Sequence, residues 1–212
     1  MDHFVIAITR TCGSGATSIG RILAKNLGVE LYDRNILRLA SDDSGISEEL
    51  FARADEDQKQ SLLFRASQKV YTGGLIPPEK EDFTSNNNLF NYQAKVLREL
   101  ADESSYVVIG RAADYVLRDR RDVVKIFIHA SREYRIGRAM EVYGDTREEA
   151  EENIRRSDRA RAAYYHHISG RRWGEAANYD LTVDSSRGVP QAAEEILRYL
   201  EANGLADLQS VR

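Results

Sequence analysis

The sequence predicts an α/β fold in which one parallel β-sheet is covered by α-helices on both faces. Three observations carry this prediction: short continuous apolar runs of strand length, amphipathic helical patterns between them, and a glycine-containing turn directly after the first run. Strands that alternate with helices pair in parallel, because the helix supplies the crossover connection. A chain of 212 residues has room for one such domain with a full core and a small insertion.

Five segments are predicted to be strands. Four of them are short, continuous and apolar, as expected for parallel strands that are buried on both faces. These are residues 4–8, 106–109, 123–128 and 181–183. A shorter candidate, residues 30–32, follows the first predicted helix.

Three amphipathic patterns predict helices between or after these strands. In the first, Ile19, Ile22, Leu23 and Leu27 recur at helical spacing, and Gly28 is placed to end the helix. The other two patterns are carried by the apolar positions 89, 96, 97 and 100 and by positions 192, 196, 197 and 200.

The stretch from about residue 43 to residue 88 does not fit the alternation of strands and helices. It holds polar helical segments at 48–54 and 59–70, followed by a loop with paired glycines, paired prolines and the asparagine run 86–88. We interpret it as an insertion between strands that is more mobile than the core.

The composition excludes several classes of protein. A net charge of −4 and a pI near 5.7 argue against binding to a nucleic acid polymer, which requires a basic surface. Cys12 is the only cysteine and forms no internal disulfide, which suits a reducing compartment. There is no apolar run long enough for a membrane span and no signal peptide pattern. The expectation is a cytoplasmic protein without a membrane partner.

Arginine outnumbers lysine 24 to 6 in this chain. Arginine is favoured where phosphate or carboxylate oxygens are gripped by two parallel hydrogen bonds. A GC-rich genome produces the same excess, so the composition leaves both explanations open.

The turn after the first strand has the features of an anion-binding loop. Gly13 and Gly15 allow backbone N–H groups to turn inward, and the following helix start adds a partial positive charge. The predicted phosphate-binding residues are Gly13, Ser14, Gly15, Ala16, Thr17 and Ser18. The alternative is a tight strand-to-helix turn in which Ser14 or Ser18 caps the helix. A Walker A loop has a lysine before its Ser or Thr, and this loop has none.

The order of features along nearly the whole chain resembles the cytidylate kinase-like family, a branch of the P-loop nucleoside monophosphate kinases. The resembling segments are VIAITRTCGSGATSIGRILAKNLGVELYD, YVVIGRAADYVL, VVKIFIHASREYRIGRAM and RRSDRARAAYYHHISGRRWGEAANYDLTVDSS. Against the family's usual loop, G-S-G-K-G-T, Ala16 stands at the lysine and Ser18 at the magnesium-binding Thr. Arg10 stands at the motif's first glycine. Loops without lysine look typical of this branch.

The resemblance implies a P-loop NTPase-type three-layer sandwich with five parallel strands in the order 2-3-1-4-5. It implies one kinase-like domain over residues 1–212, with a core at 1–42 and 88–212. The acceptor-binding insertion would lie at about 43–88 and the lid at about 146–172.

The resemblance also implies acceptor-binding residues. Asp33, after the second strand, would lie beside the acceptor, and Arg38 would hold its phosphate. The alternative is that Asp33 caps a helix and Arg38 is solvated. Arg111 follows a buried strand at the crevice edge of the sheet, and Asp114 would compensate for the family aspartate that Ala112 replaces. Arg111 and Asp114 could instead form a plain surface pair.

The remaining candidate catalytic residues are arginines. Arg135 and Arg138 match the family pattern A-S-x-E-x-R-x-x-R and would approach the phosphates opposite the glycine loop. Arg155, Arg159 and Arg161 would belong to the lid, although an ordinary solvated helix with Glu–Arg pairs carries the same pattern. We predict that Arg10 replaces the missing lysine at the phosphates. The alternative is that the side chain of Arg10 turns away from the phosphates toward an acidic neighbour on the surface.

The predicted function is ATP- and magnesium-dependent phosphoryl transfer to a nucleoside monophosphate, with CMP or dCMP first. The partners would be a nucleotide donor and a small monophosphate acceptor. Two alternatives remain: a nucleotide-binding sensor without turnover, and a kinase for another small acceptor. The sequence leaves the oligomeric state open, a homodimer included.

Overall fold

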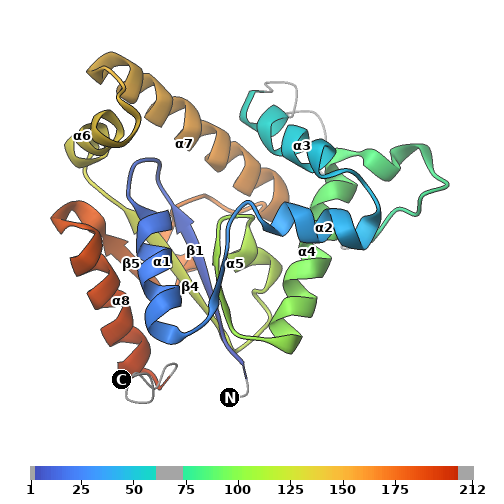
Figure 1. Cartoon of the computed structure of the whole chain (residues 1–212), viewed down its shortest axis with the longest axis horizontal. Helices are drawn as coiled ribbons and strands as arrows, with labels where there is room; N and C mark the ends of the chain where they lie inside the picture. The colour runs from blue at the N-terminus through green and yellow to red at the C-terminus, as the bar shows by residue number, and fades with distance from the viewer. Residues whose placement is uncertain (1–2, 61–73, 205–212) are drawn as a thin grey trace.

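Five parallel strands form the centre of the molecule in the computed structural model, which describes residues 3–60 and 74–204 (Figure 1). Their order across the sheet is β2-β3-β1-β4-β5, as predicted. The strands are β1 (Val5–Arg10), β2 (Glu30–Tyr32), β3 (Tyr106–Ile109), β4 (Val123–His129) and β5 (Leu181–Asp184).

Strand β1 is central because its side chains are apolar on both faces of the sheet. It pairs with β3 from Val5↔Tyr106 onward and with β4 from Val5↔Val123 onward. Ile6 and Ile8 join the core on one face, and Val5 and Ala7 join the core on the other. The strand therefore delivers the loop that follows it to the middle of the sheet's carboxyl edge.

Helices α1 (Ala16–Leu27) and α8 (Val189–Ala202) cover one face. Ile19 and Leu23 of α1 pack with Ile196 of α8 in a fully buried cluster. The predicted end of α1 is confirmed: Gly28 has φ +65° and its N–H donates to the carbonyl of Ala24.

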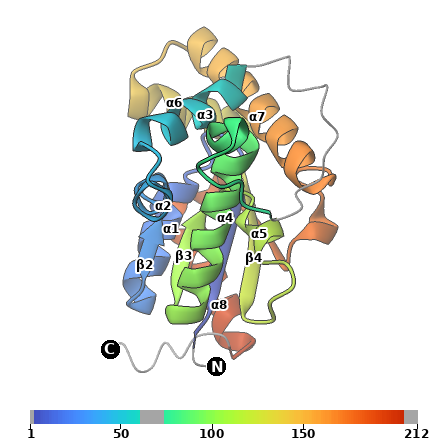
Figure 2. The same ribbon diagram turned by 90° about the vertical axis from the view of Figure 1, so that its right-hand side faces the viewer.

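Helix α4 (Asn86–Glu103), the short α5 (Ala113–Val116) and the carboxyl end of α7 (Arg147–Ser169) cover the other face, as Figure 2 shows for α4. The prediction of a loop at residues 86–88 was wrong, because α4 begins at Asn86. Asn88 is fully buried, and its side-chain amide bonds the N–H and carbonyl of Ile76 and the carbonyl of Phe83. These side-chain bonds fix the preceding segment to the helix start.

Between β2 and α4 the described residues form three elements: α2 (Ile36–Ser44), α3 (Glu48–Gln60) and the 3₁₀ turn η2 (Glu81–Thr84). Ile46, Phe51 and Ala54 are buried in the main core, so this segment is less polar inside than its sequence indicates. The helix predicted at 59–70 falls almost wholly outside the described residues. The division into a core and an insertion stays a prediction.

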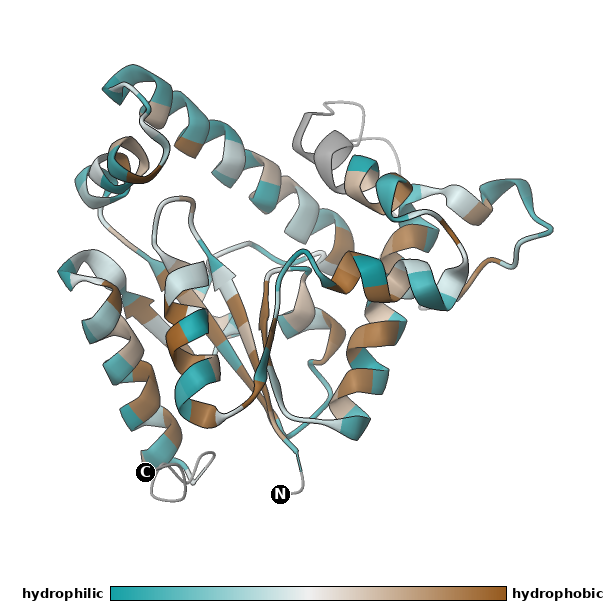
Figure 3. Ribbon diagram, viewed as in Figure 1, coloured by the Kyte–Doolittle hydropathy of each residue, from teal (hydrophilic) through white to brown (hydrophobic). Residues whose placement is uncertain are grey.

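Helices α6 (Arg132–Tyr143) and α7 lie over the carboxyl edge of the sheet (Figure 1). A capping box starts α7: Thr146 and Glu149 bond each other's backbone N–H. Figure 3 shows that α7 is largely hydrophilic and the strands are hydrophobic. The last turns are η3 (Ala176–Asn178) and η4 (Ser185–Arg187). Within residues 3–60 and 74–204, no helix has the length and apolarity needed to cross a membrane.

Candidate active site

The glycine loop leaves the end of β1 and is held in place by neighbouring elements. The N–H of Thr11 donates to the carbonyl of Ile128 at 3.0 Å, and the hydroxyl of Ser14 donates to the carbonyl of Thr11 at 2.9 Å. The buried hydroxyl of Ser185 donates to the carbonyl of Ser14 at 2.7 Å. Gly13 has φ +78°, and a Cβ there would lie 2.9 Å from the carbonyl oxygen of Arg135. Only glycine fits this turn without displacing α6.

The loop presents unpaired backbone donors at the start of α1. Among the described residues, the N–H groups of Gly13, Gly15, Ala16, Thr17 and Ser18 donate to no protein acceptor. Gly15 is the N-cap and no side chain caps the helix, so the interpretation of Ser14 or Ser18 as a cap was wrong. Free N–H groups at a helix start attract an anion.

Arg138 of α6 brings a positive charge to this loop. Its Nη2 donates to the hydroxyl of Ser18 at 3.1 Å, and a Cβ on Gly15 would lie 3.1 Å from its Nε. A guanidinium therefore lies over the loop whose sequence lacks the lysine.

The contact between Arg138 and Ser18 bears on the predicted magnesium ion. A cation already bonds the hydroxyl that would ligate the metal. No group of three or more His, Cys, Asp or Glu residues in 3–60 and 74–204 is arranged to hold a metal. These residues do not form a ready magnesium site, because Mg²⁺ in such proteins is bound by carboxylates together with substrate phosphates.

Asp158 of α7 connects the helix directly to the loop. Its carboxylate accepts the N–H of Cys12 at 2.7 Å and forms an ion pair with Arg135. Nη1 of Arg161 lies 3.7 Å from the same carboxylate. Arg135 also donates to the carbonyl of Cys12 at 3.3 Å. Two predicted site arginines are thus gathered at the loop by one acid from α7.

The guanidinium of Arg10 lies beside Gly110 and not at the start of α1, where a lysine of the loop would stand. A Cβ on Gly110 would lie only 2.1 Å from Nη1 of Arg10, so the guanidinium rests against the end of β3. Arg10 is therefore beside the segment that carries Arg111, and Arg138 is the arginine whose guanidinium lies at the N-cap of α1.

The backbone after β3 is strained. Gly110, Arg111 and Ala112 have φ of +77°, +60° and +49° in succession. A left-handed residue with a side chain costs roughly 1–2 kcal/mol. Such strain is held at functional sites by surrounding bonds, and here the N–H of Gly110 donates to the carbonyl of Ile8 at 2.8 Å. The strain favours a functional position for Arg111.

Asp114 is buried instead of lying on the surface, so the interpretation as a plain surface pair with Arg111 was wrong. It is 3 % exposed, and its two carboxylate oxygens accept from Thr9 at 3.1 Å and from Tyr165 at 2.7 Å. Burial raises the pKa of Asp114, and the hydrogen bonds from Tyr165 and Thr9 lower it in part. With both oxygens engaged, a contact between Asp114 and an acceptor stays a prediction.

Asp33 and Arg38 lie near the same edge of the sheet. The N–H of Asp33 donates to the side chain of Asn35 at 2.7 Å, and Asn35 is the N-cap of α2. The interpretation of Asp33 as the helix cap was therefore wrong. Arg38 is exposed on α2. Binding of the acceptor by either residue stays a prediction.

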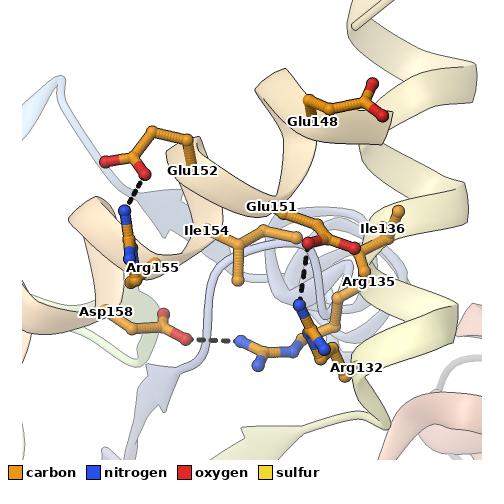
Figure 4. Close-up of a pocket in the computed structure, with 9 residues that line it drawn as sticks. All are labelled: Arg132, Arg135, Ile136, Glu148, Glu151, Glu152, Ile154, Arg155 and Asp158. Carbon is orange, nitrogen blue, oxygen red and sulfur yellow. Dashed lines mark hydrogen bonds and ion pairs between the residues drawn. The ribbon is translucent and has the colours of Figure 1, made fainter. Parts of the chain in front are cut away.

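The predicted lid arginines separate into two groups. Arg155 and Arg159 are exposed, and Arg155 pairs with Glu152 of the same helix. Arg161 faces the loop through Asp158. A hollow of about 560 Å³ lies between α6 and α7. Figure 4 shows the ion pairs Arg132–Glu151, Arg135–Asp158 and Arg155–Glu152 on its wall. The acids there neutralise much of the arginine charge.

Five buried side-chain atoms in the described chain have no hydrogen-bond partner. They are Thr11 Oγ1, Gln93 Oε1, Arg135 Nε, Arg161 Nη1 and Tyr179 OH. A buried polar atom without a partner costs about 1–3 kcal/mol. Three of the five belong to the loop or to the arginines around Asp158, so ligand or water oxygens would find donors there.

The sequence analysis did not select Asp158, Thr9 or Tyr165 as site residues. Asp158 stands alone among four arginines in RRSDRAR, which is a recognisable signal. Asp158, Arg161 and Tyr165 recur at helical spacing and so share one face of α7. Thr9 carried no signal of its own, because its partner is distant in sequence.

The fold and the site define the class of protein. A five-stranded parallel sheet in this order, with a glycine loop at the end of its central strand and arginine-bearing helices above it, is the P-loop kinase-type fold. The chain belongs to the cytidylate kinase-like family, whose model matches residues 5–187. Membership supports phosphoryl transfer as the chemistry.

Individual relatives agree with this assignment. The chain is 26 % identical to a cytidylate kinase of Methanopyrus kandleri over 203 residues, which are 92 % of this chain and 91 % of the relative. An uncharacterized protein from Eubacterium ventriosum has a similar structure, with a TM-score of 0.69, 20 % identity and coverage of 94 % and 99 % of the two chains. Shikimate kinase from Bacteroides thetaiotaomicron is similar at a TM-score of 0.52, 14 % identity and coverage of 93 % and 98 %. These two structures support the fold alone.

Proposed function

We propose that this protein transfers a phosphoryl group from ATP to a nucleoside monophosphate, with CMP or dCMP as the first candidates. The observation that carries the proposal is the set of N–H groups of Gly13, Gly15, Ala16, Thr17 and Ser18, which have no protein acceptor among the described residues, next to the guanidinium of Arg138. Backbone donors and a cation together form a site for the phosphates of a donor nucleotide.

The protein's part in the reaction is to position the reactants and to neutralise charge. The transferring phosphoryl group spreads its charge over three oxygens. Arg138 would contact it from the loop, and Arg135 and Arg161 would contact it once phosphate replaces the carboxylate of Asp158. Helix α7 would exclude water from the site. Magnesium would arrive with ATP, held by the phosphates, and would neutralise part of their charge.

The acceptor side of the site would be formed after β2 and β3. Arg111 has a strained backbone at the crevice edge, and Arg10 lies against the same segment. Asp33 and Arg38 follow the neighbouring strand. We propose that Arg111 and Arg10 face the acceptor phosphate, with Arg38 and Asp33 farther out.

A nucleotide-binding sensor without turnover is the second candidate. It is favoured by Ala16 in place of the lysine and by the absence of a ready magnesium site among the described residues. A kinase for another small acceptor differs from the main proposal only in the acceptor.

A coupled assay of ADP release with Mg–ATP and a panel of monophosphates tests these candidates. Sustained ADP release that depends on CMP or dCMP supports the proposal. ADP release that depends on another acceptor identifies a kinase for that acceptor instead. Tight ATP binding without turnover on any acceptor identifies a sensor. Failure of ATP or pyrophosphate to bind at all contradicts both. Arg198→Ala, an exposed arginine paired with Glu194 on α8, is the matched control for arginine variants.

A further inference from the structure

A chain of three buried polar groups links the strand before the glycine loop to α7. Thr9, Asp114 and Tyr165 are 5 %, 3 % and 3 % exposed. The hydroxyls of Thr9 and Tyr165 donate to opposite oxygens of one carboxylate. The three residues come from β1, α5 and α7, so a single side chain holds three elements together.

Thr9 and Tyr165, the two ends of this hydrogen-bonded series, are close in sequence to residues of the candidate site. Thr9 directly precedes Arg10 and is two residues before Thr11, where the loop begins. Tyr165 shares the inward face of α7 with Arg161 and Asp158. Asp158 lies seven residues earlier, about 10 Å along the helix axis. A small movement of α7 at Tyr165 therefore changes where Asp158 and Arg161 meet the loop.

Stability alone gives a weak reason for a carboxylate at this position. Burial raises the pKa of Asp114 even though two hydroxyls donate to it and Arg171 attracts its charge. The folded protein thus favours the protonated form of this carboxyl group over the ionised form, and apolar side chains of similar size often serve a core equally well. The carboxylate adds a fixed geometry, because one oxygen accepts from the hydroxyl of Thr9 and the other accepts from the hydroxyl of Tyr165.

We propose that Asp114 and Tyr165 are positioning residues, which set the location of α7 relative to β1 and so hold Asp158 and Arg161 at the glycine loop. This inference rests on the proposed function, in which α7 closes over the transferring group. In this role neither residue needs to contact the reactants. Each acts through the placement of the helix.

The first test needs no substrate. Tyr165→Phe and Thr9→Val each remove one hydroxyl, and Tyr106→Phe is the matched control, because the buried hydroxyl of Tyr106 donates to the carbonyl of Leu97 at the other end of the sheet. The N–H of Cys12 donates to the carboxylate of Asp158. We expect the hydrogen-exchange rate of this N–H to rise about fivefold or more in Tyr165→Phe and to stay unchanged in Tyr106→Phe. Equal Cys12 exchange in wild type and Tyr165→Phe overturns the proposal.

The second test separates positioning from a general loss of stability. In the acceptor assay, Tyr165→Phe should lower kcat about tenfold and leave the KM for the acceptor within about twofold, since misplacement affects the transition state more than binding. Thr9→Val should do the same, and the double variant should lose no more than either single one, because both hydroxyls act through Asp114. Unchanged kcat, or additive losses, contradicts the proposal. If wild type turns over no acceptor, the proposed function fails and the Cys12 exchange decides this inference alone.

Discussion

At the scale of single residues, Arg138 is the arginine whose guanidinium the structure places at the N-cap of α1, in the loop that lacks a lysine. Its guanidinium contacts both the N-cap glycine and the hydroxyl of Ser18. Arg10, the residue expected in that role from its place in the sequence, lies against Gly110. A guanidinium on α6 reaches the loop from a different direction than a loop lysine, and it can bond two phosphate oxygens at once.

This difference gives a prediction for two arginine variants. Arg138→Ala should lower kcat/KM for ATP by about two powers of ten, roughly 3 kcal/mol, as for loss of one preorganised donor. Adding Ala16→Lys to Arg138→Ala should restore part of the loss. Arg10→Ala should instead act mainly on the acceptor. Steady-state kinetics with each substrate varied measures this, with Arg198→Ala as control. Wild-type ATP kinetics in Arg138→Ala would contradict this prediction and favour Arg10 as the residue that replaces the lysine.

The buried carboxylate of Asp114 predicts a pH dependence of stability. Its pKa is raised in the folded protein, so its favourable contribution is present below the unfolded pKa and is lost as the pH rises through the folded pKa. Asp114→Asn has no proton to lose. The free energy of unfolding of Asp114→Asn minus that of wild type should therefore increase with pH above about 4.

Denaturant unfolding of both proteins between pH 4.5 and pH 8 measures this difference. The trend with pH is the observable, because loss of one hydrogen bond in the variant shifts all values by a constant amount. Tyr165, Thr9 and Arg171 act on the same carboxylate, and Tyr179 adds a buried hydroxyl close by. A difference that does not change with pH would show that Asp114 has an ordinary pKa.

At the scale of elements, α7 packs against α6 and the main core through buried apolar residues and reaches the glycine loop through polar ones. Its exposed face is charged, and its inward face carries Asp158, Arg161 and Tyr165. The carboxylate of Asp158 accepts the N–H of Cys12 and pairs with the guanidinium of Arg135. A phosphate would bond the same two donors. A donor phosphate bound as proposed would compete with this acid for these donors.

The consequence is a prediction about Asp158→Ala. Removal of the carboxylate frees the N–H of Cys12 and the guanidinium of Arg135, and inorganic pyrophosphate should bind about three- to tenfold more tightly, a gain of about 1 kcal/mol. Calorimetric titration of wild type and variant tests it. Glu194→Ala is the control, because Glu194 pairs with Arg198 on the exposed face of α8. Weaker pyrophosphate binding in Asp158→Ala would mean that the acid organises the site instead of competing with phosphate.

At the scale of the whole molecule, we expect the sheet to be more rigid than the two segments above its carboxyl edge. The strands are buried on both faces, whereas α7 is mostly polar. We expect amide protection of residues 149–167 and of the described part of 43–88 to increase when Mg–ATP and CMP bind together, and that of β1 and β4 to change little. Amide exchange with and without both ligands measures this. Equal protection of α7 in both states would contradict closure.

Much of the fold was predictable because its signals are local. An apolar run marks a buried strand, and helical spacing marks a helix, since both follow from the geometry of a few neighbouring residues. The glycine loop was predictable for the same reason: the backbone donors and the helix start lie within six residues of one another. The start of α4 was missed because the side chain of Asn88 supplies bonds to Ile76 and Phe83 that a run of asparagines does not reveal.

The sequence by itself determined the five strands, the helices around them, the glycine loop and the presence of many arginines near one edge of the sheet. The tertiary structure decided which arginines meet the loop and which acids hold them. Arg138 and Ser18 are 120 residues apart, and Cys12 and Asp158 are 146 apart. Long-range pairs of this kind depend on how α6 and α7 cross the sheet, and that crossing is set by packing of the whole core, which no local pattern encodes.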